Sequence, residues 1–156
     1  MNRIIIFFCI TISMWGCNST PSATQGPNKR KNSDVGSVYY DVIIQSNKPK
    51  DDWEQIAIEK LDRDKLVQQL FKQIIDNKLR IEDFYEETKI PVAEFKKKIS
   101  NGEIDPNKIT KLQFEEVWNT QQVPIQKRIK SIVFAENAYD HLGKKMGYKP
   151  LFICYY

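Results

Sequence analysis

Apolar residues in the middle of the chain recur at the spacing of an α-helix. The clearest series, Leu66–Ile75, places its apolar side chains on one face, and either Asp62 or Asp64 can cap its start. A shorter series at 53–61 predicts a preceding helix, and residues 91–99 predict a later one. The sequence therefore predicts a helical first half.

The pattern becomes that of β-strands in the last third of the chain. Segments 109–118, 128–135 and 148–156 are rich in β-branched and aromatic residues and are separated by loops, which predicts a three-stranded antiparallel meander. Residues 37–44 predict a short strand or an extended arm, and residues 81–85 predict a brief turn of helix. We therefore expect an α+β fold, in which a small helical N-terminal half packs on the meander.

The first seventeen residues have the order of a bacterial lipoprotein signal. Arg3 precedes an apolar run at 4–12, and Gly16 stands directly before Cys17. The run is shorter than the roughly 20 apolar residues that a membrane-spanning helix needs. We expect a signal peptide at 1–16 and lipid attachment at Cys17, with an ordinary cleaved signal and an uncleaved anchor as the alternatives.

Residues 17–36 are mostly small or polar and cannot bury enough apolar surface to fold, so they predict a flexible tether. An extended segment of this length spans roughly 60 Å. The remaining residues, 37–156, are enough for one small domain. Because no acidic residue follows the acceptor cysteine directly at 18–20, we expect an outer-membrane lipoprotein that faces the periplasm.

Charge and residue types exclude several functional classes. The net charge of +4 arises from lysines, arginines and acids that are interleaved along the chain, which argues against nucleic-acid binding. His141 is the sole histidine and no cysteine pair has ligand spacing, so we expect no metal and no cofactor. Cys154 is expected to be a small buried residue in the last strand.

Neighbouring acids provide an enzymatic alternative. Pairs at 51–52, 82–83, 86–87 and 115–116 could each be a carboxylate dyad of a hydrolase, which needs two carboxylates about 5 to 10 Å apart in one cleft. Each pair lies in a highly charged part of the chain, where solvated surface positions explain the acids better. We therefore predict no catalytic residue and a protein that is not an enzyme.

Aromatic residues exceed what so small a core requires. Trp53, Trp118, Phe152 and Tyr155 are candidates for packing or for subunit contact, since Tyr and Trp are common interface anchors. The same excess supports an alternative function, in which the aromatic rings form a stacking surface for a glycan or peptidoglycan.

The C-terminal third resembles a known family. Glu116-Val117-Trp118, the segment 128–132 and the terminal segment 147–156 are similar to the end of the GldN/PorN family of gliding motility and type IX secretion. Trp53 and the segment 58–65 agree in order with its upstream part. The resemblance covers most of the chain after the tether, and its terminal stretch is the specific one.

Departures from the family pattern include Ile153 in place of a tryptophan, Thr120-Gln121 in place of an aromatic-acidic pair, and a shorter region at 85–111. The resemblance implies a non-enzymatic periplasmic component that associates with a lipoprotein, GldK/PorK, in a ring under the outer membrane. We therefore predict an assembly component of a gliding or type IX secretion apparatus, with a GldK/PorK-like partner and self-association. A truncated paralogue without ring formation is the alternative. In the family the lipid usually comes from the partner, whereas Cys17 would supply it here.

Overall fold

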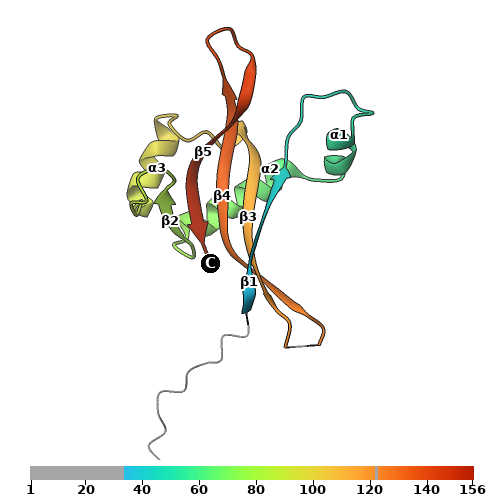
Figure 1. Ribbon diagram of the computed structural model, residues 1–156. Helices are drawn as coiled ribbons and strands as arrows, with labels where there is room; N and C mark the ends of the chain where they lie inside the picture. The colour runs from blue at the N-terminus through green and yellow to red at the C-terminus, as the bar shows by residue number, and fades with distance from the viewer. Residues whose placement is uncertain (1–33, 122) are drawn as a thin grey trace, which may run out of the picture. The chain divides into compact units, whose positions relative to one another are not determined.

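The computed structural model describes residues 34–121 and 123–156 of the chain. Within them, five antiparallel strands form one sheet with the order β1-β3-β4-β5-β2 (Figure 1). The strands are β1 (Asp34–Ile43), β2 (Arg80–Asp83), β3 (Ile109–Asn119), β4 (Gln126–Tyr139) and β5 (Lys145–Tyr155). The helices are α1 (Trp53–Ile58), α2 (Arg63–Ile75), α3 (Val92–Ser100) and the 3₁₀ turn η1 (Pro106–Lys108).

This sheet corrects the predicted fold class. β3, β4 and β5 pair in chain order, but β1 adds to the outer side of β3 and β2 to the outer side of β5. The expectation of a helical half packed on a three-stranded meander was therefore wrong. Periodicity shows which face of a segment is buried, but it does not show which distant strand completes its hydrogen-bond ladder.

The boundaries at the two edge strands also differ from the prediction. Residues 80–83 form β2 instead of a helical turn, because Ile81 faces the core while its neighbours Arg80 and Glu82 remain more exposed. So short an alternation does not distinguish a strand from a helix in the sequence. β1 begins at Asp34, inside the predicted tether. The rest of the tether and the signal peptide lie outside the described residues.

α2 is positioned by a cap and by an arginine at its start. The Asp62 side chain accepts a hydrogen bond from the Lys65 N–H at 3.0 Å, as expected of an N-cap residue. Arg63 Nη2 donates to the Ile109 carbonyl at 2.8 Å and also to the Pro106 carbonyl. The start of α2 is therefore held against the turn that leads into β3.

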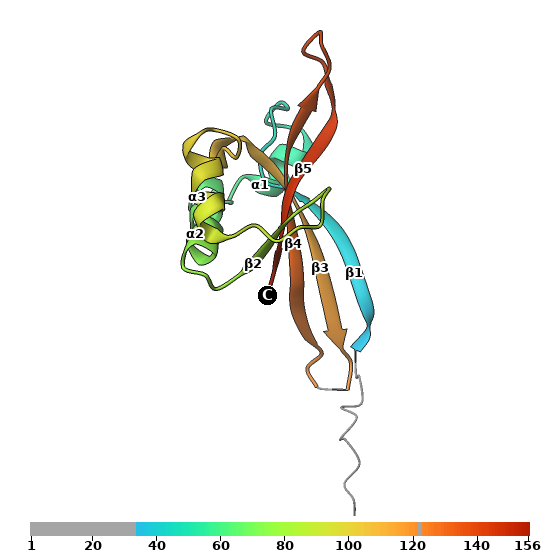
Figure 2. The same ribbon diagram turned by 90° about the vertical axis from the view of Figure 1, so that its left-hand side faces the viewer.

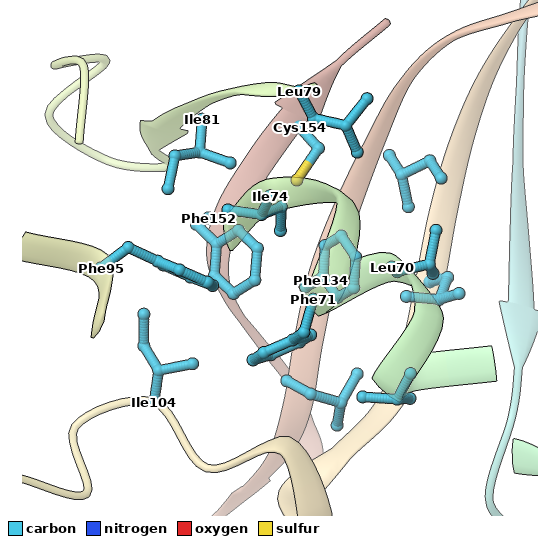
Figure 3. Packing of buried hydrophobic residues seen from close by; sticks show 14 of the residues in the cluster. Leu70, Phe71, Ile74, Leu79, Ile81, Phe95, Ile104, Phe134, Phe152 and Cys154 are labelled. Carbon is cyan, nitrogen blue, oxygen red and sulfur yellow. The ribbon is translucent and has the colours of Figure 1, made fainter. Parts of the chain in front are cut away.

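The hydrophobic core lies between the sheet and the two longer helices, α2 and α3, which lie on the same side of the sheet (Figure 2). Its centre is an aromatic cluster of Phe71, Phe95, Phe134 and Phe152 (Figure 3). The Phe134 and Phe152 rings stack with centroids 4.6 Å apart. Cys154 is fully buried in the same core, as predicted, and burial raises the pKa of its thiol.

The β3–β4 and β4–β5 hairpins project from opposite ends of the sheet (Figure 1). The β3–β4 hairpin turns at the end where β1 begins, because Asp34 lies opposite Asn119 in the register. The β4–β5 hairpin turns beyond Tyr139. Since β4 has 14 residues, its two ends are about 45 Å apart.

Candidate functional site

Helices α2 and α3 cover one face of the sheet (Figure 2), and the opposite face carries a row of polar and aromatic side chains. Tyr39, Glu115, Ser131, Tyr155 and Arg80 are successive cross-strand neighbours from β1 to β2. The first four of them help to line a cavity of about 310 Å³. This face of the sheet, which we call the open face, is the first candidate surface.

Glu115 is the centre of the hydrogen-bond network on the open face. Its Oε1 accepts from Ser37 Oγ at 2.7 Å and from Lys130 Nζ at 2.7 Å. Its Oε2 accepts from Ser131 Oγ at 3.0 Å, and Tyr39 also hydrogen-bonds the carboxylate. We call these five residues the Glu115 cluster, and it joins β1, β3 and β4.

A β-bulge in β4 makes this cluster possible. Glu115 pairs with Ser131 whereas Glu116 pairs with Ile129, so Lys130 is an extra residue in the ladder. A bulge places two residues against one and re-aims a side chain that regular alternation would send to the other face. Lys130 and Ser131 can therefore both reach Glu115.

The pKa of Glu115 reflects these contacts. Burial raises the pKa of this carboxyl group, but the hydrogen bonds from Lys130, Ser37, Ser131 and Tyr39 outweigh burial and lower it to about 2. The hydrogen bond to Glu115 in turn raises the pKa of Tyr39 and that of Lys130. Glu115 is thus a carboxylate fixed by its partners, which is typical of a structural ion pair.

The free edge of β1 is the second candidate surface. β1 is ten residues long, and within the described residues its outer side has no strand partner. Val38, Tyr39 and Tyr40 on this strand are 43%, 63% and 39% exposed. A long edge strand with exposed apolar and aromatic side chains is the kind of edge to which another strand can add.

The register shows which backbone groups of β1 point outward. Ile44, just after the strand, donates its N–H to Thr110 on the β3 side at 2.9 Å. Because the direction alternates along an antiparallel strand, Val42, Tyr40 and Val38 also point their N–H groups toward β3. The N–H of Tyr39 therefore points outward, where it can pair with an added strand.

The predicted interface residues do not come together. Trp53 lies on α1 and is 69% exposed, whereas Phe152 is fully buried in the core. Tyr155 is on the open face, where Arg80 lies 4.5 Å from its ring centroid. Trp118 lies near the end of β3 with Lys127 over its ring. Cys17, the predicted lipid site, lies outside the described residues.

Three of the four acid pairs contain a residue with a structural partner. Asp52 caps α1 through the Glu54 N–H, and Asp83 accepts from the N–H groups of Tyr85 and Glu86. Glu115 belongs to the cluster described above. Among residues 34–121 and 123–156, no group of three or more His, Cys, Asp or Glu side chains has an arrangement that could hold a metal ion.

A third candidate site is a cavity of about 900 Å³ between α1 and the start of α2. Gln55 and Arg63 help to line it. Gln55 Oε1 and Arg63 Nε are buried there and have no hydrogen-bond partner among the described residues. An unpaired buried acceptor and donor are costly. Because both atoms have almost no accessible surface, a ligand in the cavity can bond to them only if neighbouring side chains move.

Sequence reasoning missed the Glu115 cluster, although one signal was present. Two adjacent acids at 115 and 116 break the alternation of polar and apolar residues in this strand, and an acid in a half-buried strand needs a partner. The partner Lys130 became identifiable only with the bulge.

The chain matches no protein-family model, and its sequence matches no curated protein. Within the described part of the chain, no helix is long and apolar enough to span a membrane.

Proposed function

We propose that this chain is a lipid-anchored component of the cell envelope that acts by assembling with another protein, and that the partner adds to the edge of β1. The observation that carries the proposal is the unpaired outer edge of β1 with Val38, Tyr39 and Tyr40 exposed along it. Strand addition gives affinity through main-chain hydrogen bonds and specificity through alternate side chains.

The open face supports this mode of assembly. The Glu115 cluster ties β1 to β3 and β4, so the edge is held rigid before a partner arrives. A preorganised edge loses less conformational entropy on binding than a mobile one. Tyr39 contributes to both surfaces, because its side chain reaches Glu115 while its backbone N–H points outward.

The resemblance of the C-terminal region suggests the context. We propose a gliding-motility or type IX secretion apparatus, with a GldK/PorK-like lipoprotein as the partner and self-association as a second contact. Under this proposal Cys17 carries the lipid and no residue has a catalytic role. Deleting the gene should reduce gliding or secretion of type IX cargo. Unchanged gliding and secretion would overturn this context.

Affinity pull-down of the tagged chain from detergent-solubilised envelopes, read by mass spectrometry, tests the assembly role. Tyr39→Pro removes the outward N–H and Tyr39→Ala keeps it, while both lose the same ring. We expect a defined partner to co-purify with Tyr39→Ala and to be lost with Tyr39→Pro. Circular dichroism must show both variants folded.

Two other outcomes separate the parts of the proposal. A partner that co-purifies equally with both variants would place the contact elsewhere on the molecule, and assembly would stand. Recovery of the unmodified chain as an isolated monomer would overturn assembly itself.

The cavity beside α1 favours a second candidate function, the binding of a glycan or peptidoglycan fragment. Its unpaired Gln55 Oε1 and Arg63 Nε would offer an acceptor and a donor once neighbouring side chains move, and Trp53 lies on the same helix as Gln55. A glycan array and a cell-wall pull-down test it. Binding that is lost with Gln55→Leu or Trp53→Ala supports it, whereas no binding by the unmodified chain excludes it.

A further inference from the structure

We propose that the tip of the β3–β4 hairpin touches the surface of an anionic membrane. The β3–β4 tip is defined here by Val123 and Ile125, with Trp118 and Lys127 at its base. This contact rests on the proposed lipid anchor at Cys17, which brings the domain to the membrane, but it concerns a different part of the chain.

The exposure of the tip is the first observation. Val123 is 99% exposed and Ile125 is 54% exposed, although both are aliphatic residues that proteins usually bury. They project beyond the last cross-strand pair of the hairpin, Asn119 with Gln126. Apolar side chains at the end of a narrow hairpin can enter the boundary between headgroups and acyl chains without any change in the sheet.

The residues beside the β3–β4 tip include basic and aromatic side chains but no acid. From Trp118 to Arg128 the chain has no acidic residue, and Lys127 and Arg128 follow the tip directly. Lys127 Nζ lies 4.4 Å from the centroid of the Trp118 ring. The Trp118 Nε1 is itself buried, so the ring only positions Lys127, whose ammonium group is the kind of cation that is favoured beside anionic lipid headgroups.

The position of the tip in the fold is the second, independent observation. The described chain enters the sheet at Asp34, which lies opposite Asn119 at the base of this hairpin (Figure 1). A tether that leads from the membrane therefore reaches the domain at the same end as Val123 and Ile125. The β4–β5 hairpin also exposes apolar residues, Leu142 at 80% and Met146 at 69%, but it lies about 45 Å away along β4.

The β4–β5 hairpin is a matched control, since it lies about 45 Å from the membrane when the sheet stands upright on the β3–β4 tip. The test uses the chain from Cys17 to Tyr156, because residues 34–121 and 123–156 share one hydrophobic core. Cys17 is coupled to a maleimide lipid in vesicles, while Cys154 is fully buried and does not compete. This coupling supplies the anchor whether or not the cell acylates Cys17.

A single tryptophan reports contact at each end. In a Trp53→Phe, Trp118→Phe background, Val123→Trp labels the β3–β4 tip and Leu142→Trp labels the opposite hairpin. Vesicles contain acyl-brominated phosphatidylcholine with or without phosphatidylglycerol. We expect tryptophan fluorescence to be quenched at least twofold more strongly in Val123→Trp than in Leu142→Trp. Phosphatidylglycerol should strengthen the quenching of Val123→Trp, and high salt should remove the difference between the two variants.

Ile125→Asp in the Val123→Trp chain should remove the quenching, whereas Met146→Asp in the Leu142→Trp chain should change nothing. Equal quenching at both ends, stronger quenching at the β4–β5 hairpin, no quenching at either, or no effect of phosphatidylglycerol would overturn the proposal. The native anchor is tested separately. If Cys17→Ser stays with the membrane fraction in cells, the anchor proposal fails. The vesicle experiment still tests the membrane contact of the tip, because the coupled lipid supplies the anchor there.

Discussion

Replacing Glu115 with Gln tests whether the Glu115 cluster stabilises the fold through its charge. The side chain keeps its shape and can still accept hydrogen bonds, but the ion pair with Lys130 is lost. Glu115 is only 7% exposed, but the Lys130 side chain is 50% exposed, so water screens this ion pair in part. We therefore expect the substitution to lower the free energy of unfolding at neutral pH.

The pKa of Glu115 sets the magnitude. Folding lowers it from the ordinary value of 4.5 to about 2. At 1.36 kcal/mol for each pKa unit, the ionised carboxylate contributes at most about 3 kcal/mol at pH 7, and solvent screening at Lys130 lowers this contribution. Because the folded pKa lies below the unfolded one, this contribution is complete above about pH 5 and is lost as the pH falls toward 2. For a domain of this size, 3 kcal/mol corresponds to roughly 10 °C in Tm.

Urea unfolding followed by circular dichroism at pH 7 and at pH 3 measures the difference in free energy of unfolding between the unmodified chain and Glu115→Gln, together with its pH dependence. At pH 7 the free energy of unfolding of the unmodified chain should exceed that of Glu115→Gln by up to about 3 kcal/mol, and this difference should be smaller at pH 3. Glu116→Gln is the matched control, since this neighbour lies outside the cluster and should cost less than about 1 kcal/mol. Equal stabilities at pH 7, or a gap that does not change with pH, would refute the reasoning.

Other substitutions test the core and the elements that flank it. Phe152→Ala should cost about 3 to 5 kcal/mol in urea unfolding, since its ring is fully buried among other aromatic rings. Asp62→Ala should cost about 1 kcal/mol in the same assay by removing the cap of α2, whereas Asp62→Asn should cost less. Cys154 should react with a thiol reagent only after denaturant is added, because it is buried and burial raises its pKa. Reaction under native conditions would contradict the placement of β5.

The sequence predicted those helices and strands that are defined by residues close together along the chain. α2 has the predicted periodic apolar face and is capped by Asp62, one of the two candidates in the sequence, and β3, β4 and β5 follow the alternation of the last third. In each case, the residues that define the element lie within a few positions of one another.

The edge strands and the Glu115 cluster depend on contacts between distant residues. Ser37 and Glu115 are 78 positions apart, and only the pairing of β1 with β3 brings them together. Lys130 reaches Glu115 because β4 has one extra residue at this point. Neither the composition nor the hydrophobic periodicity of the sequence predicts such a bulge. The four residues of β2 are too few to show a period.

The two proposed surfaces together specify where a partner must lie. If the β3–β4 tip rests on the membrane, β1 starts at that surface and its free edge faces sideways, so a strand that adds to it comes from a neighbour on the same membrane. Tethering both proteins to one bilayer raises their effective concentration, which strengthens binding without any new contact. A lipid-coupled partner should therefore bind the lipid-coupled chain at least tenfold more tightly than the same two proteins bind in solution. Equal binding in the two settings would show that the edge of β1 recruits a soluble partner instead.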